Sequence, residues 1–144
     1  NLGVVRAHDE RSFVVADIPG LVPGAHKGIG LGTQFLRHIE RTNLFVHLID
    51  ASGSAGRDPL QDYRDIMHEL VEYDRAKAEE EGFRPLAERE QLVVLNKIDV
   101  LPPEDLAILQ DRFAREGIAI LSISAASHRG LRELVTEIGK RVLK

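Results

Sequence analysis

The chain has 144 residues, of which 43% are hydrophobic and 29% charged, and its formal net charge at pH 7 is −4. This length fits one globular domain, and the acidic balance excludes an overall basic surface for nucleic acid, so sequence-specific DNA is not an expected partner. No cysteine and no bilayer-length apolar run occur, which excludes disulfides, predicts no membrane partner and fits a cytoplasmic location.

The first part of the chain is predicted to form a β-hairpin, a helix and a strand. Leu2–Arg6 and Ser12–Ala16 are apolar runs on either side of a short polar turn, a pattern typical of two antiparallel strands. A helix is expected near residues 33–41, and the apolar run Leu44–Ile49 predicts a strand. His47 lies inside this run, so we expect it to be a core residue with a hydrogen-bond partner.

Helices then alternate with strands. The predicted elements are a helix from about Pro59 to near Gly82, a strand at Leu92–Leu95, a helix at Pro103–Arg115, a strand at Ile118–Ile123, and a final helix with Leu131, Leu134, Val135, Ile138 and Val142 on one face. This order predicts an α/β fold whose sheet is mostly parallel and covered by helices, with the hairpin as an antiparallel edge. We interpret the charged segment 76–90 as a solvated helix end and loop and not as a partner site.

The most informative motif, Asn96-Lys97-Ile98-Asp99, directly follows a buried strand. It places polar side chains at the carboxyl edge of the sheet, where open α/β folds bind ligands. The Asp99 carboxylate can accept two parallel hydrogen bonds, which matches the N1–H and exocyclic amine of guanine and not adenine. Asn96 can tie neighbouring loops together, and the methylene stem of Lys97 can lie along the face of the base.

Two shorter motifs accompany it. Asp17-Ile18-Pro19-Gly20 follows the second strand of the hairpin, and in a nucleotide-hydrolysing site an Asp-x-x-Gly sequence holds Mg²⁺ through water and meets the terminal phosphate with a glycine N–H. Asp50-Ala51-Ser52-Gly53 fits the same pattern. We prefer the first copy because a glycine-rich segment follows it.

Ser124-Ala125-Ala126 follows the last predicted strand. Small residues there let backbone N–H groups reach the guanine O6, which is an acceptor where adenine presents a donor.

In this order, the three motifs resemble the third, fourth and fifth motifs of translation-factor-like GTPases, and the glycine-rich stretch 20–42 resembles the Obg family. The resemblance covers essentially the whole chain. It implies a Ras-like P-loop GTPase fold, with residues 1–144 as a partial GTPase domain. It also implies binding of GTP and GDP with Mg²⁺ held through water by Asp17, hydrolysis of GTP to GDP and phosphate, and a ribosome or large-subunit precursor as partner.

The sequence contains no Gly-x-x-x-x-Gly-Lys-Ser/Thr phosphate loop, which the family carries upstream of the segment found here. Without its backbone nest and lysine, this chain alone is expected to bind nucleotide weakly. The family places the phosphate-loop strand at the centre of the sheet, between the strands at 13–16 and 44–49. Three outcomes are open: another segment supplies this strand, the two strands pair directly, or the chain folds poorly.

No residue is assigned as catalytic. The position after Gly20, where many GTPases carry a water-orienting Gln, is Leu21, which predicts slow intrinsic hydrolysis. His26, Lys27 and Gln34 are candidates for this role on a loop whose five glycines suit a switch. Two alternatives stand beside the GTPase: a non-catalytic interaction module that keeps the fold, and an unrelated flavodoxin-like or receiver-like domain.

Overall fold

The computed structural model describes residues 2–6, 11–16 and 42–143. The expected helix near 33–41, the motif Asp17–Gly20 and the candidates Leu21, His26, Lys27 and Gln34 lie outside the described residues. In chain order the elements are β1 (Leu2–Arg6), β2 (Ser12–Ala16), β3 (Phe45–Asp50), the 3₁₀ turn η2 (Ser54–Gly56), α2 (Pro59–Lys77), β4 (Gln91–Asn96), the 3₁₀ turn η3 (Ile98–Val100), α3 (Pro103–Arg115), β5 (Ile120–Ser122) and α4 (Leu131–Val142).

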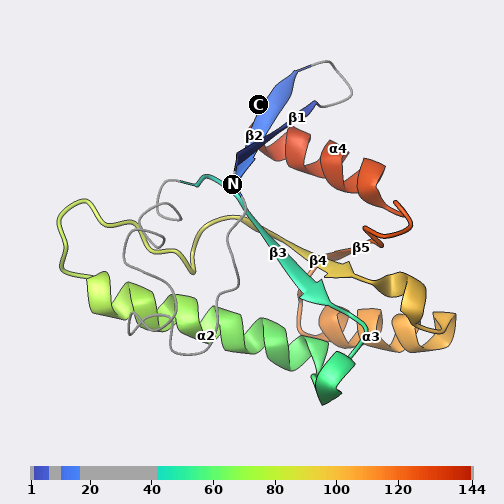
Figure 1. Ribbon diagram of the computed structural model, residues 1–144. Coiled ribbons are helices and arrows are strands. Elements are labelled where there is room, and N and C mark those ends of the chain that lie inside the picture. Colours follow the sequence, from blue (N-terminus) through green and yellow to red (C-terminus); the bar gives the residue numbers. More distant parts are fainter. Residues whose placement is uncertain (1, 7–10, 17–41, 144) are drawn as a thin grey trace.

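The described strands form two separate sheets (Figure 1). The predicted hairpin is confirmed: β1 and β2 pair antiparallel, with Leu2 opposite Ala16. The other sheet is fully parallel in the order β3-β4-β5. Parallel strands need a crossover between them, and α2 and α3 provide the two crossovers. The predicted alternation of strands and helices is therefore confirmed.

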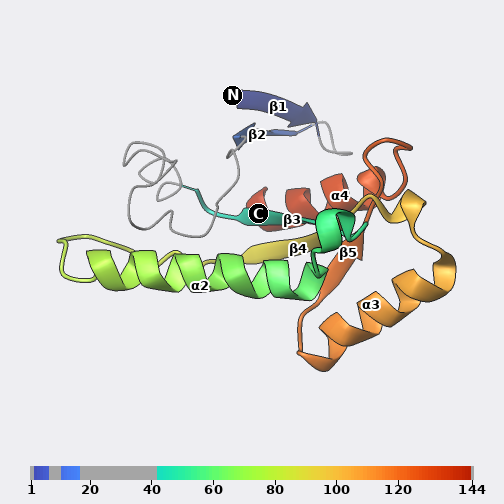
Figure 2. The same ribbon diagram turned by 60° about the horizontal axis from the view of Figure 1, so that its bottom comes forward.

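Helices cover both faces of the parallel sheet, because side chains of successive β4 residues point to opposite faces. Val93 and Leu95 pack in a cluster with Leu60 of α2 and Phe113 of α3. Their neighbours Leu92 and Val94 join Ile123 in a second cluster, which receives the apolar side chains of α4. Figure 2 shows the resulting layers: α2 and α3 lie below the sheet, and α4 lies between the sheet and the hairpin.

Among the described residues, β3 is an edge strand and does not pair with β2. Its Val46 and Leu48 are 36% and 56% exposed. By register these two residues lie opposite Leu92 and Val94, so they are on the face of the sheet that α4 covers. The apolar side chains of α4 pack over the neighbouring strands and leave this part of β3 exposed. Direct pairing of the two strands, one of the three expected outcomes, is therefore not the arrangement in this part of the chain.

Helix α2 ends at Lys77, five residues before the predicted end near Gly82. The Asp74 carboxylate accepts hydrogen bonds from the backbone N–H groups of Leu86 (2.6 Å) and Ala87 (2.9 Å). Leu86 is completely buried beside Leu70. The segment 76–90 is thus only partly the solvated loop we expected, since the chain must turn back to bury Leu86.

The predicted strand 118–123 is also shorter, with β5 restricted to Ile120–Ser122. The N–H of Ile118 donates to the carbonyl of Phe113, and that of Gly117 donates to Ala114, while Gly117 has φ +74°. This is a Schellman-type helix end, which needs a left-handed residue where glycine carries no penalty. The amide of Ile118 therefore caps α3 and does not pair with β4.

The predicted apolar face of α4 is real but incompletely buried. Leu131, Leu134 and Ile138 are half-buried against the second cluster, whereas Val142 is 36% exposed. Complete burial of all five predicted side chains would contribute up to about 7–15 kcal/mol, so the contribution of α4 as observed is smaller.

His47 is half-buried, and its ring stacks on Tyr63 with centroids 5.3 Å apart. Its Nδ1 lies 3.4 Å from Oε1 of Gln91. Burial lowers the pKa of His47, and the contacts with Gln91 and Asp62 oppose that effect without reversing it. These contacts fit the expected role of a core residue with a polar partner.

Candidate functional site

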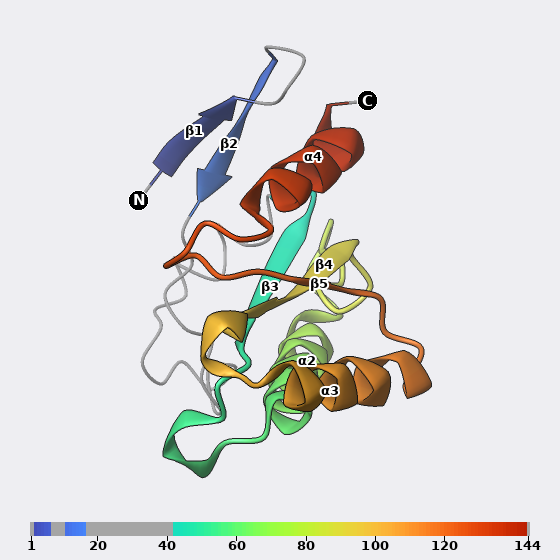
Figure 3. The same cartoon turned by 90° about the vertical axis from the view of Figure 1, so that its right-hand side faces the viewer.

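Three loops meet at the carboxyl end of the parallel sheet. The register places Asp50 at the end of β3 beside Asn96 at the end of β4, and Leu95 beside Ser122 of β5. Figure 3 shows the loops that follow β3, β4 and β5 together on the left of the sheet. The motif at 96–99 and the motif at 124–126 are therefore brought to one edge, as the sequence predicts for parallel strands.

Asn96 joins two of these loops through its side-chain oxygen. Its Oδ1 accepts hydrogen bonds from the backbone N–H of Ala125, at 3.0 Å, and of Lys97, at 2.8 Å. The first contact spans 29 residues of sequence and fixes the loop after β5 against the loop after β4. The tie expected of Asn96 is thus present.

Asp99 and Ser124 are held together by a hydrogen bond of 2.7 Å from the Ser124 hydroxyl to Asp99 Oδ1. Ser124 is completely buried, and its Oγ also accepts a hydrogen bond from the N–H of Ser127 at 3.2 Å. Asp99 is exposed. A buried hydroxyl therefore orients a carboxylate that remains open to a ligand.

Lys97 and Ile98 take different positions in the same motif. Lys97 has φ +65°, a left-handed conformation that is uncommon for residues other than glycine, and its side chain is 57% exposed. Ile98 is only 3% exposed and packs in the first core cluster, while its N–H donates to the carbonyl of Ile123. Ile98 therefore anchors the loop to the core, and its side chain does not face a ligand.

Gly130 is a residue of this region that sequence reasoning missed. It has φ +78°, and a Cβ there would lie 2.6 Å from the carbonyl oxygen of Ser122. The N–H of Ser124 donates to the carbonyl of Arg129, which closes the loop just before this glycine. A glycine directly before an apolar helical pattern was the available signal. Ala125 and Ala126 are exposed on this closed loop.

Asp50, considered from sequence only as a competing Asp-x-x-Gly residue, has a different role in the structure. Its Oδ1 accepts from the N–H of Ser52 at 2.8 Å and from the Ser52 hydroxyl at 2.5 Å. Its Oδ2 accepts from the Ser54 hydroxyl and from Lys97 Nζ, each at 3.1 Å. Partial burial works to raise the pKa of Asp50, but the hydrogen bonds from Ser52, Lys97 and Ser54 outweigh it and lower the pKa to about 2.

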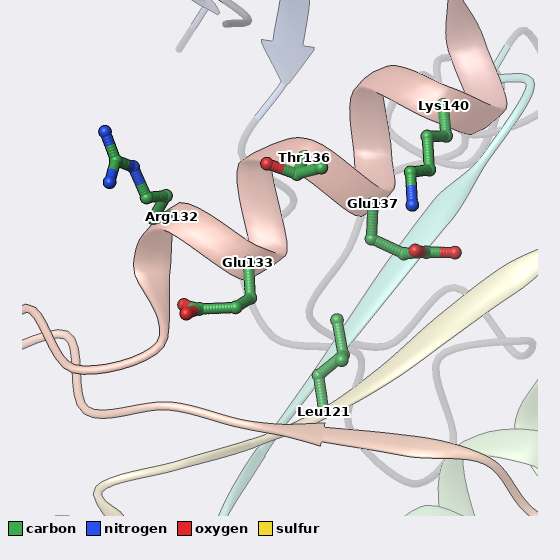
Figure 4. Close-up of a pocket in the computed structure, with 6 residues that line it drawn as sticks. All are labelled: Leu121, Arg132, Glu133, Thr136, Glu137 and Lys140. Atoms are coloured by element: carbon green, nitrogen blue, oxygen red, sulfur yellow. The ribbon is translucent and has the colours of Figure 1, made fainter.

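Two surface hollows on the described residues are lined by other side chains. One is lined by Leu121 of β5 and by five residues that stand out from α4, shown in Figure 4: Arg132, Glu133, Thr136, Glu137 and Lys140. The other is lined by Asn43, Arg84, Pro85, Glu88, Arg89 and Glu90. Neither of these two hollows is lined by residues of the motifs at 96–99 and 124–126.

Within residues 2–6, 11–16 and 42–143, no group of three or more histidine, aspartate or glutamate side chains is placed to hold a metal ion. Asp17, the expected contact to Mg²⁺, lies outside these ranges. None of the described helices is long and apolar enough to cross a membrane.

Two solved structures resemble this fold. Era in complex with MgGDPNP and nucleotides 1506–1542 of 16S ribosomal RNA aligns with a TM-score of 0.59 and 20% identity, covering 97% of this chain and 43% of Era. Era from Aquifex aeolicus bound to GDP·AlF₄⁻ gives the same TM-score and coverage at 22% identity. At these identities the similarity concerns the fold alone, and it shows that the chain has a Ras-like GTPase fold.

The sequence comparisons give the family. A protein-family model described as 50S ribosome-binding GTPase matches residues 1–97. GTPase Obg of Bdellovibrio bacteriovorus is 57% identical over 145 aligned positions, covering all of this chain and 42% of the relative. GTPase Obg of Bacillus cereus is 48% identical over 143, covering 99% of this chain and 31% of the relative. The chain belongs to the 50S ribosome-binding GTPases, as an Obg-type member, and it spans less than half the length of these curated relatives.

Proposed function

We propose that residues 1–144 are part of the GTPase domain of a longer Obg-type protein, and that the loops after β4 and β5 bind the guanine base of GTP or GDP. The observation that carries this proposal is the pair of contacts between these loops. Asn96 fixes the backbone at Ala125, and Ser124 orients the exposed Asp99 carboxylate.

The geometry suits guanine for a chemical reason. An oriented carboxylate presents two acceptors, which pair with the N1–H and the exocyclic amine of guanine. Adenine offers no such pair of donors on that edge. Asn96 already accepts from the N–H of Ala125, so the N–H of Ala126, the next residue on this exposed loop, is the donor for O6, and the stem of Lys97 covers the base. Ile98 contributes by holding the loop in place.

The phosphate side of the site rests on the family resemblance. There Asp17-Ile18-Pro19-Gly20 would meet the terminal phosphate, with Asp17 holding Mg²⁺ through water and the ion neutralising charge on the phosphates. A phosphate loop from upstream in the longer protein would complete the site. We therefore propose that the longer protein hydrolyses GTP to GDP and phosphate, whereas residues 1–144 alone bind nucleotide weakly.

We further propose that the longer protein works in the cytoplasm on a ribosome or large-subunit precursor. The family description names the 50S ribosome, and one structural neighbour is bound to ribosomal RNA. Since the chain carries a net charge of −4, such contacts would come from local surfaces or other domains.

Calorimetry tests the proposal. Mg²⁺–GDP and Mg²⁺–ADP are titrated into the longer protein, into residues 1–144 and into the longer protein with Asp99→Asn. We expect binding of GDP and not ADP by the longer protein, weaker binding by residues 1–144, and loss of GDP binding in the variant.

A matched ligand separates loss of recognition from misfolding. Xanthosine diphosphate carries a carbonyl where guanine has its amine, so the side-chain amide that Asp99→Asn introduces can donate to it. Recovery of binding with this ligand supports the assignment of Asp99. If the longer protein binds neither GDP nor ADP, the proposal is wrong, and the interaction module becomes the better description.

A further inference from the structure

Asp50 and Lys97 form an ion pair that ties the loop after β3 to the proposed base-binding loop. Lys97 Nζ lies 3.1 Å from Asp50 Oδ2, and the two side chains are 57% and 34% exposed. The pair connects residues 47 positions apart in sequence. In the register, Asp50 lies beside Asn96, so the carboxylate stands next to the start of the 96–99 motif.

The Asp50 carboxylate is oriented by residues of its own turn, independently of Lys97. Ser52 donates two hydrogen bonds to Oδ1 from its N–H and hydroxyl, and Ser54 donates one to Oδ2. Ser52 and Ser54 follow in the same short turn, so the orientation of the carboxylate is set by local sequence. An ionised, immobile acceptor is thus presented to the lysine.

The backbone of Lys97 is also held in one conformation. Its φ of +65° is a conformation that non-glycine residues rarely adopt and that surrounding structure must impose. Asn96 Oδ1 accepts from the N–H of Lys97, and Ile98 is buried immediately after it. With the backbone fixed and the ammonium held by Asp50, both ends of the flexible lysine stem are restrained.

We infer that Asp50 is a positioning residue for guanine-nucleotide binding, which acts by holding the stem of Lys97 in place as a wall for the base. This inference rests on the proposed function. A free lysine side chain loses much rotational freedom when it covers a ligand. A lysine already restrained by Asp50 loses less of it, so the ion pair favours binding although it does not touch the nucleotide.

The test measures dissociation and affinity of a fluorescent GDP in the longer protein. Asp50→Asn removes the charge and keeps the size, and we expect it to weaken binding about three- to fivefold, the factor that an ion pair of this exposure supplies. Asp58→Asn is the matched control. Asp58 lies in the same segment between β3 and α2 and forms an ion pair of similar exposure with Arg112, at 2.7 Å, the two side chains being 41% and 43% exposed. Loss of the Asp58 charge should leave GDP affinity unchanged.

A double-mutant cycle separates positioning from a merely structural role. Lys97→Met keeps an apolar stem and removes the ammonium. If Asp50 acts through Lys97, Asp50→Asn should have no further effect in the Lys97→Met protein. An equal loss of affinity in both backgrounds would show that Asp50 only stabilises its own turn and would overturn the inference, as would unchanged or tighter binding by Asp50→Asn alone.

The two proposals fail in different ways. If the unmodified protein does not prefer GDP to ADP, the proposed function itself is wrong. If it prefers GDP but Asp50→Asn binds as tightly as the unmodified protein, only the positioning role is refuted.

Discussion

Replacing Ser124 by alanine removes a hydroxyl that serves both the fold and the proposed site. Its Oγ donates to Asp99 at 2.7 Å and accepts from the N–H of Ser127 at 3.2 Å. Ser124 is completely buried and Ser127 is exposed, so the variant loses a partly buried hydrogen bond, which contributes about 0.5–1.5 kcal/mol. Asp99 is exposed and can be hydrated instead, so we expect a total loss of stability of about 1–2 kcal/mol.

The effect on binding is separate. Without Ser124, the Asp99 carboxylate must be ordered by the ligand, and fixing one such side chain costs about 1 kcal/mol, a factor of about five in affinity for GDP. The assay is equilibrium binding of GDP to the longer protein, together with thermal unfolding of the same samples.

Ser122→Ala is the matched control, two residues earlier in the chain. The Ser122 hydroxyl accepts from Gln110 Nε2 at 2.9 Å, so the variant also loses a partly buried hydrogen bond between side chains. We expect a comparable loss of stability and no change in GDP affinity. Equal affinities for the two variants, whether both reduced or both unchanged, would refute the reasoning about Ser124.

Two further predictions concern the frame that holds the site. Gly130→Ala should lower stability by at least about 2 kcal/mol, because alanine is strained at φ +78° and its Cβ would lie 2.6 Å from a backbone oxygen. The control Gly117→Ala, at φ +74° with nothing within 4 Å of the added Cβ, should show only the conformational cost of about 1–2 kcal/mol. Equal unfolding temperatures of the two variants would contradict this prediction. Burial lowers the folded-state pKa of His47 below 6.5, so the unfolded chain binds more protons than the folded chain as pH falls through 6.5, and the free energy of unfolding should fall with pH. In His47→Phe this loss of stability should be smaller. Denaturant unfolding at pH 7.5 and 5.5 measures the loss, and the same loss in both proteins would exclude His47 as the cause.

The sequence alone was sufficient for features with a local cause. The apolar run at 92–95 and the helical spacing after Pro59 and Pro103 identify elements of the right type, because burial of one face dominates their choice of structure. The motif 96–99 is recognisable since its polar residues follow a buried strand. Parallel pairing then brings it to the edge where the 124–126 loop lies, as predicted.

Tertiary structure decided features that depend on residues distant in sequence. The end of α2 is set by Asp74, which binds the backbone at Leu86, and the start of β5 is set by the cap that uses the amide of Ile118. The contact between Asp50 and Lys97 spans 47 positions and depends on strand register. Periodicity reports which side of an element is apolar. It does not report which distant donor meets a given acceptor, because that depends on how the elements pack.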